Sequence, residues 1–128
     1  MPVVLLDFMK SSGPSGIHPL GIITNPPYGK QSRQALAFIR HGLELIMERG
    51  GFLALLLPFE FDSRAARDHV VGGHEIFARK ITVGRRIRWL NLPQKKAGPM
   101  GHHSWFLWVE NARICTRLRL AGSMRTAA

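Results

Sequence analysis

The sequence predicts an α/β domain in which strand, helix, strand and helix are followed by an antiparallel hairpin. Two observations carry this prediction. The run Phe52-Leu53-Ala54-Leu55-Leu56-Leu57 is apolar without alternation, as expected of a strand that is covered on both faces. Ahead of it, apolar residues recur at helical spacing and stop at Gly50-Gly51, a common kind of helix end. The chain has 128 residues, which is long enough for one such domain with a modest core.

The elements ahead of the buried strand follow from the same patterns. Val3 to Leu6 is expected to form a short strand that ends at Asp7-Phe8. After a Ser/Gly/Pro loop from 11 to 16, Leu20 to Thr24 is predicted to form the next strand. Ser32 is then expected to cap a helix. The core-facing stripe of this helix is predicted to be Leu36, Ile39, Leu43, Ile46 and Met47.

A second, shorter helix is expected after the buried strand. Asp62 or Ser63 is predicted to cap it, since both residue types favour that position. The helix is expected to run to about Val71, where Gly72-Gly73 ends it.

Two apolar segments near the end of the chain predict the hairpin. They are Ile81 to Leu90 and Trp105 to Val109, and a Pro/Gly/Lys-rich stretch from 93 to 103 separates them. Residues 1–110 are therefore assigned to the folded domain. Residues 111–128 are assigned to a basic C-terminal tail.

The tetrapeptide Asn25-Pro26-Pro27-Tyr28 directly follows the predicted strand Leu20 to Thr24. Two consecutive prolines hold φ at about −65° and keep the residue before them out of the helical region, so the carbonyl groups point in fixed directions. In α/β sheets, ligands bind outside the carboxyl ends of strands, which is where this tetrapeptide is expected to lie. The alternative interpretation is a simple turn, because asparagine and proline are common turn residues.

The tetrapeptide resembles the signature of the adenine-N6 DNA methyltransferases, which transfer a methyl group from S-adenosylmethionine to an exocyclic amino group. The resemblance extends over about residues 5 to 110. It includes the order of the elements, Pro58-Phe59-Glu60-Phe61 after the buried strand, and the final segment Trp105-Phe106-Leu107-Trp108. It implies a partial Rossmann-like methyltransferase sheet. In the family the strands lie in the order three, two, one, four, five, seven, six, and the tetrapeptide follows strand four.

The resemblance also implies roles for individual residues. The catalytic set would be Asn25, Pro26, Pro27 and Tyr28. The Asn25 side-chain oxygen and the Pro26 carbonyl would accept hydrogen bonds from the amino group, and the Tyr28 ring would stack on the extruded base. Cofactor contacts would come from Asn25 and from Asp7, which belongs to an Asp-Phe pair that precedes the tetrapeptide at a matching distance. A strand-end turn is the alternative role for Asp7.

A glycine-rich cofactor turn is not apparent in the sequence. Such a turn follows a strand and opens a helix, whereas Gly72-Gly73 ends a helix and Gly98 to Gly101 lies within a hairpin loop. We therefore expect a carboxyl-half methyltransferase fragment with S-adenosylmethionine as its ancestral cofactor, incomplete or inactive as an isolated chain. The alternative is a non-catalytic nucleic-acid-binding or complex-forming module derived from the same fold. A third interpretation keeps the chemistry but takes an RNA base or a protein glutamine as acceptor.

The charge of the chain favours nucleic acid as the partner. Lys and Arg number 18 against 8 Asp and Glu, which gives a net charge of +10. DNA is the expected partner and RNA the alternative. Strand edges also carry such charges to discourage aggregation. The densest basic stretch, and the predicted nucleic-acid-binding set, is Arg79, Lys80, Arg85, Arg86, Arg88, Lys95 and Lys96.

Several other classes of protein are disfavoured. The single cysteine, Cys115, excludes an internal disulfide and favours a reducing cytoplasm. No metal site is expected, because neither His102-His103 nor the pair His69 and His74 has helical ligand spacing. No membrane partner is expected either, because no apolar stretch reaches the roughly 18 residues of a membrane span.

The absent strand one has a consequence for assembly. In the family it pairs with the strand that precedes the tetrapeptide, so Leu20 to Thr24 would here have an unpaired edge. Val3 to Leu6 folding back is one way to cover that edge. The others are a homodimer formed through Leu20 to Thr24, or a complementing methyltransferase subunit.

Overall fold

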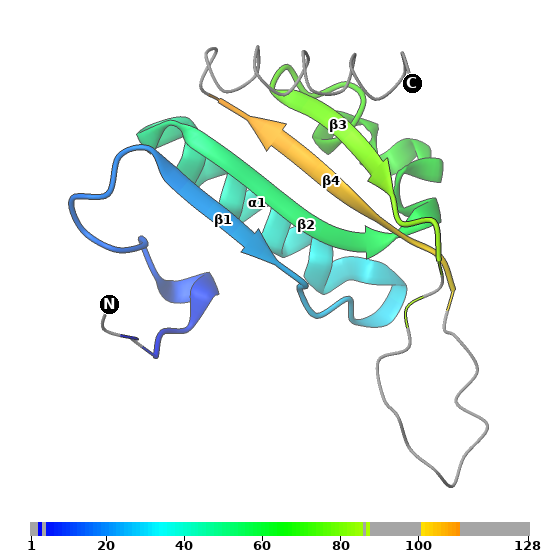
Figure 1. Cartoon of the computed structure of the whole chain (residues 1–128), viewed down its shortest axis with the longest axis horizontal. Helices are drawn as coiled ribbons and strands as arrows, with labels where there is room; N and C mark the ends of the chain where they lie inside the picture. The colour runs from blue at the N-terminus through cyan, green and yellow to red at the C-terminus, as the bar shows by residue number, and fades with distance from the viewer. Residues whose placement is uncertain (1–2, 4, 86, 88–100, 111–128) are drawn as a thin grey trace, which may run out of the picture.

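A computed structural model describes residues 3, 5–85, 87 and 101–110 of the chain. Its strands are β1 (Leu20–Thr24), β2 (Gly51–Pro58), β3 (Phe77–Thr82) and β4 (His103–Val109). They form one four-stranded mixed sheet in the order β1-β2-β4-β3 (Figure 1). β1 and β2 are parallel, and β4 is antiparallel to both β2 and β3. The predicted α/β class is therefore confirmed.

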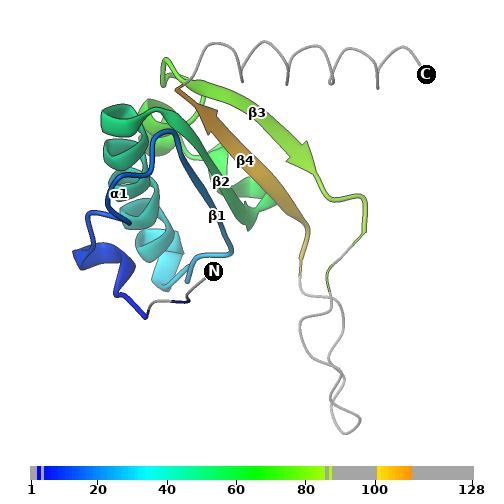
Figure 2. The same cartoon turned by 60° about the vertical axis from the view of Figure 1, so that its left-hand side comes forward.

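The α-helix α1 (Arg33–Arg49) connects the two parallel strands and packs on one face of the sheet (Figure 2). Its contact with β2 is close, because a Cβ at Gly42 would lie 2.8 Å from a methyl carbon of Leu53. The next residue after the helix cap, Gly51, has φ of 111°. A Cβ there would overlap the Leu20 carbonyl, so the turn from α1 into β2 requires glycine.

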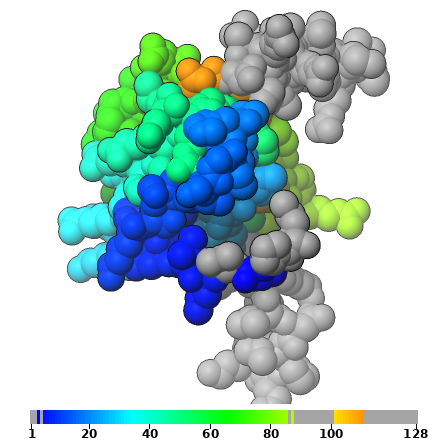
Figure 3. Space-filling model, turned by 90° about the vertical axis from the view of Figure 1, so that its left-hand side faces the viewer, coloured from blue at the N-terminus to red at the C-terminus, as the bar shows by residue number. Residues whose placement is uncertain are grey.

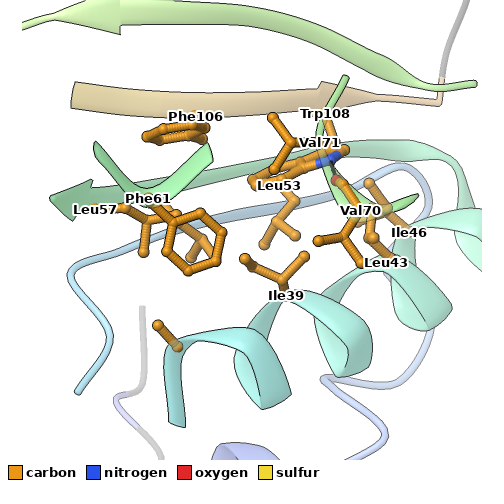
Figure 4. Close-up of a cluster of buried hydrophobic side chains, with 12 residues drawn as sticks. Ile39, Leu43, Ile46, Leu53, Leu57, Phe61, Val70, Val71, Phe106 and Trp108 are labelled. Atoms are coloured by element: carbon orange, nitrogen blue, oxygen red, sulfur yellow. Dashed lines mark hydrogen bonds between the residues drawn. The ribbon is translucent and has the colours of Figure 1, made fainter. Parts of the chain in front are cut away.

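The hydrophobic core lies between the sheet and the helices on that face (Figure 4). Trp108 is fully buried, and its Nε1 donates a hydrogen bond of 2.6 Å to the Val70 carbonyl. Burial of each large apolar side chain stabilises the fold by about 1.5–3 kcal/mol. The buried set is Ala35, Ile39, Leu43, Ile46, Leu53, Leu55, Leu57, Phe61, Val70, Val71, Phe106 and Trp108.

The stripe predicted for α1 is largely confirmed. Ile39, Leu43 and Ile46 are buried, and Leu36 packs against the core. The prediction for Met47 is wrong, since 47% of it is exposed. A residue one position beyond Ile46 is turned about 100° around the helix axis, which moves its side chain away from the sheet.

The helix begins where it was predicted, but its cap differs. Ser32 has left-handed backbone angles and its side chain makes no capping hydrogen bond. Instead the Tyr28 carbonyl accepts from the amides of Gln34 and Ala35, at 3.1 and 3.4 Å. A backbone oxygen of the preceding loop therefore satisfies donors that a serine side chain was expected to satisfy.

The predicted strand from Val3 to Leu6 is absent from the described residues of that segment. Val3 and Leu5 are 97% and 98% exposed, and the chain next forms a 3-10 helix, η1 (Phe8–Lys10). The Phe8 ring stacks on Phe38 of α1 with 4.9 Å between ring centroids. This contact docks the N-terminal segment on the helix.

The second predicted α-helix is replaced by two 3-10 helices, η3 (Phe59–Ser63) and η4 (Ala65–Val70). Arg64 between them is extended. The Phe61 carbonyl accepts a hydrogen bond from the Arg67 guanidinium at 2.8 Å. This side-chain hydrogen bond joins η4 to η3 across the extended Arg64.

The antiparallel hairpin is confirmed with a shifted first strand. β3 begins at Phe77 and ends at Thr82, so only the first two residues of the predicted segment Ile81 to Leu90 belong to it. Residues 86 and 88–90 lie outside the described part. The earlier start has a packing reason, because the Phe77 ring contacts Trp108 with 5.5 Å between centroids. The predicted tail, residues 111–128, also lies outside the described part.

Candidate functional site

The tetrapeptide lies at the carboxyl edge of the parallel pair β1 and β2. Thr24, its immediate predecessor, pairs with Leu55 of β2, and β2 ends three residues later at Pro58. The carboxyl ends of both strands therefore lie at the same edge of the sheet (Figure 1). This is the edge at which open α/β sheets bind ligands.

Within the tetrapeptide, Asn25 and Tyr28 are held together. The Tyr28 hydroxyl lies 3.0 Å from Asn25 Oδ1 and 3.1 Å from the Leu56 carbonyl, and its one hydrogen is shared between these acceptors. Asn25 is exposed and Pro26 is buried. An amide oxygen has two lone pairs, so Asn25 Oδ1 keeps one for a ligand while the hydroxyl fixes its direction.

Tyr28 remains a donor over a wide pH range. Partial burial raises the pKa of its hydroxyl above the ordinary value, because the anion would lose solvation. Its ring lies near the His103 ring, with 6.0 Å between centroids and 29° between planes. His103 is buried on β4 opposite Pro58, a place that only the strand register reveals.

The loop that follows the tetrapeptide has an unusual backbone. Gln31 and Ser32 have φ of 55° and 58°, in the left-handed region that residues other than glycine rarely adopt. Arg67 stabilises this conformation by donating a 2.6 Å hydrogen bond to the Gln31 carbonyl. Strained residues of this kind collect at binding and catalytic sites.

An apolar cavity of about 400 Å³ runs along the whole of β1 and reaches Thr24, next to Asn25. Phe38 and Leu45 of α1 line it, and so does the N-terminal segment, whose Phe8 ring stacks on Phe38. Figure 3 shows this side of the molecule, with the N-terminal segment and β1 next to each other at the surface. No charged side chain is among the described residues that line the cavity.

Asp7 has a local role in the structure. Its carboxylate accepts from the Met9 amide at 3.1 Å, caps η1 and lies 3.8 Å from Lys10 Nζ. Its neighbour Phe8 reaches the cavity along β1, and Asp7 is not among the described residues that line it.

The predicted nucleic-acid-binding residues are only partly described. Arg79 is half-buried on β3 and Arg85 is exposed just after it. Lys80 Nζ lies 2.7 Å from Asp62 Oδ1 and 4.1 Å from the centre of the Phe59 ring, so it is engaged within the fold. The other predicted members, Arg86, Arg88, Lys95 and Lys96, lie outside the described residues.

A second, more polar pocket of about 250 Å³ lies beside the same sheet edge. It is lined by two arginines that sequence reasoning missed, Arg64 and Arg67, together with Gln31, Ser32 and Glu60. Arg67 is 8% exposed. Burial and then the charge of Arg64 lower the pKa of its guanidinium. The sequence alone gives no signal for this pocket, because Arg67 and Gln31 are 36 residues apart.

The described residues contain no group of three histidine, cysteine or acidic side chains that could hold a metal ion. In the same part of the chain, no helix is long and apolar enough to cross a membrane. No protein-family model, curated protein or solved structure matches the chain.

Proposed function

We propose that the chain is an adenine-N6 DNA methyltransferase-like protein whose tetrapeptide holds the amino group of an extruded adenine. The observation that carries this proposal is the fixed orientation of Asn25 Oδ1, held 3.0 Å from the Tyr28 hydroxyl at the carboxyl end of β1. An exposed acceptor with a free lone pair, next to an aromatic ring at a sheet edge, suits an aromatic amine.

The arrangement of the sheet supports the proposal independently. If β1 and β2 correspond to strands four and five of the family, then β3 and β4 correspond to strands six and seven. The order β1-β2-β4-β3 then agrees with the family's four, five, seven, six. The sequence order of four strands allows many other arrangements, so this agreement supports a Rossmann-like methyltransferase sheet.

The chemical role of Asn25 and Pro26 would be to make adenine N6 a better nucleophile. The lone pair of adenine N6 is delocalised into the ring, which makes the amine a poor nucleophile. Asn25 Oδ1 and the Pro26 carbonyl would accept hydrogen bonds from the two amino hydrogens and favour the pyramidal amine. Because the tetrapeptide is preorganised, this costs little rearrangement during the reaction.

The residues present fit S-adenosylmethionine only in part. The apolar cavity beside β1 suits a planar adenine ring, with Phe8 on one side and Thr24 near the tetrapeptide. Its lining offers no charged group for the ammonium and carboxylate of the cofactor's amino-acid part. S-adenosylmethionine would supply the methyl group.

The test is a comparison of two bases that differ only in the amino group. A short single-stranded DNA with one adenine, and the same DNA with unsubstituted purine in its place, are titrated into the chain by fluorescence anisotropy. We expect adenine to bind about 3- to 10-fold more tightly, the value of about one hydrogen bond. Asn25→Ala should reduce this preference, because only the Pro26 carbonyl then accepts from the amino group, and should leave purine binding unchanged.

The same experiment decides between this proposal and the alternative function. A non-catalytic module that binds nucleic acid through its net charge of +10 would bind both DNAs equally before and after Asn25→Ala. Equal binding would therefore overturn the base-holding role. The corresponding RNA pair distinguishes an RNA acceptor from a DNA acceptor.

A further inference from the structure

The polar pocket beside the tetrapeptide is built around a buried cation. Arg67 Nη1 donates to the Phe61 carbonyl at 2.8 Å and Nη2 to the Gln31 carbonyl at 2.6 Å. The guanidinium also lies 4.3 Å from the centre of the Phe61 ring. All of these partners are neutral. They satisfy two of the five N–H groups but leave the positive charge uncompensated.

A second cation faces the same pocket. Arg64 is exposed, lines the pocket, and is close enough for its charge to act on Arg67. Neither arginine forms an ion pair within the described part of the chain. Glu60 is the one acidic residue among the described residues that line the pocket. Two guanidinium groups and one carboxylate leave a net positive pocket, and burying a charge without a counter-ion is costly.

The remaining polar groups suit an oxygen-rich anion. Ser32 and Ser63 both line the pocket. The Ser32 hydroxyl makes no capping hydrogen bond, and the Ser63 hydroxyl donates to the Glu60 carbonyl at 2.7 Å. The amides of the first turn of α1 are taken up by the Tyr28 carbonyl, so the guanidinium groups are the main donors. A planar guanidinium matches the geometry of two phosphate oxygens.

We propose that the Arg64 and Arg67 pocket binds one backbone phosphate of a DNA strand. This inference rests on the proposed function, which places the extruded adenine at Asn25. The pocket lies at the same sheet edge, since Pro58 at the end of β2 lines it and Leu56 of β2 accepts from Tyr28. The bound phosphate is therefore one close to the extruded adenine.

The Arg67 contact with Gln31 gives the phosphate a second effect. Gln31 belongs to the strained loop between Tyr28 and α1, and its carbonyl is held by the guanidinium that faces the pocket. A phosphate on Arg67 compensates the charge of the residue that holds this loop. Phosphate contacts set the register of a strand on a protein, so this one positions the adenine at Asn25.

The first experiment measures binding of single-stranded DNA by fluorescence anisotropy at several salt concentrations. Arg64→Ala is the test variant, because Arg64 is exposed and alanine keeps the backbone carbonyl that accepts from the Arg67 amide. Its affinity should fall about tenfold, and the slope of log affinity against log salt should decrease by about 1. Lys10→Ala is the control, since Lys10 is also exposed and lies on η1, outside the pocket. An equal loss in both variants would overturn the proposal.

The second experiment removes the charge from the ligand. A DNA that carries an uncharged methylphosphonate next to its single adenine should bind the wild-type chain about tenfold more weakly, and should bind Arg64→Ala with no further loss. If the methylphosphonate weakens binding by the same factor in Arg64→Ala as in the wild type, this phosphate does not contact Arg64 and the proposal is overturned. Inorganic phosphate should also compete with DNA for the pocket. Its binding is monitored through the NMR signals of the Arg67 side chain. Phosphate that binds there without displacing DNA would identify a free-anion site and overturn the assignment to a backbone phosphate.

These outcomes separate the phosphate pocket from the base site. If only the proposed function is wrong, adenine and purine bind equally and Arg64→Ala still weakens both. If only the phosphate pocket is wrong, the adenine preference persists and Arg64→Ala binds like Lys10→Ala.

Discussion

At the scale of single residues, the hydrogen bond between Tyr28 and Asn25 is the feature with the most direct consequences. Tyr28→Phe removes the donor to Asn25 Oδ1 and to the Leu56 carbonyl. We expect the free energy of unfolding to fall by about 1 kcal/mol. In chemical denaturation, Tyr28→Phe and Asn25→Ala should together cost less than the sum of the two, because each removes the same bond. Strict additivity would show that the bond does not form in solution.

The pH dependence of Tyr28 gives a second prediction at this scale. Burial raises the pKa of its hydroxyl, so the folded chain resists ionisation more than the unfolded chain does. The stabilisation from Tyr28 is complete below the unfolded pKa of about 10 and is lost as pH rises through the folded value. Tyr28 is the single tyrosine, so the ultraviolet absorbance of tyrosinate reports it alone. The midpoint should lie above 10 in buffer and return to about 10 in urea; equal midpoints would contradict the burial.

The residues of the site differ in how far the sequence could predict them. Asn25 and Tyr28 are three positions apart, so a local pattern is enough to place them together. Arg67 reaches Gln31 across 36 positions, and His103 meets Tyr28 through the register of β2 and β4. Contacts of that kind depend on the folded chain, and no periodicity or motif in the sequence signals them.

At the scale of the elements, the turn from α1 into β2 has a tightly constrained backbone. Gly51 has φ of 111° and faces the Leu20 carbonyl so closely that a Cβ would overlap it. Gly51→Ala should therefore lower the free energy of unfolding by more than about 2 kcal/mol in chemical denaturation. Gly84→Ala is the control, because a Cβ at Gly84 has open space around it, and it should change stability by less than about 0.5 kcal/mol. Similar effects of both substitutions would contradict the described backbone.

The elements also show what local patterns can and cannot specify. β1, α1 and β2 were predicted well, because continuous apolar strands and a helical stripe are strong signals. The second predicted helix is replaced by two 3-10 helices, in which Arg67 of η4 donates a hydrogen bond to the Gln31 carbonyl of a distant segment. The strand from Val3 was wrong because Phe8 docks on Phe38 instead. In each error a tertiary contact outweighs the local preference.

At the scale of the whole molecule, the lining of the apolar cavity predicts weak cofactor binding. The cavity beside β1 can accept a planar ring, but the described residues that line it offer no charged partner for an amino acid. In calorimetry the chain should bind S-adenosylmethionine no better than weakly, and adenosine about as well as the whole cofactor. Low-micromolar binding of S-adenosylmethionine with much weaker adenosine binding would show that the amino-acid part has partners within this chain.

The free edge of β1 predicts assembly. In the described part of the chain β1 pairs with β2 alone, and its sequence from Leu20 to Thr24 contains no charge or proline to discourage a new strand. Val3 and Leu5 do not cover the edge, since both are almost fully exposed. Ile23 is also 66% exposed. We therefore expect an exposed strand edge to recruit a second copy.

We expect an antiparallel pair of copies across a two-fold axis at Ile22, the middle residue of β1, which would join the two sheets. Ile23 of one copy would then lie opposite Gly21 of the other, where the Phe52 ring already covers the glycine. Light scattering at tens of micromolar should show a dimer, and Ile23→Lys should make it monomeric, because the substitution places a charge in that contact. Met47→Lys is the control, an exposed apolar position on α1 that should leave the dimer intact. A monomeric wild-type chain would contradict the dimer and favour a complementing subunit. A dimer that persists in Ile23→Lys would show that the interface lies elsewhere.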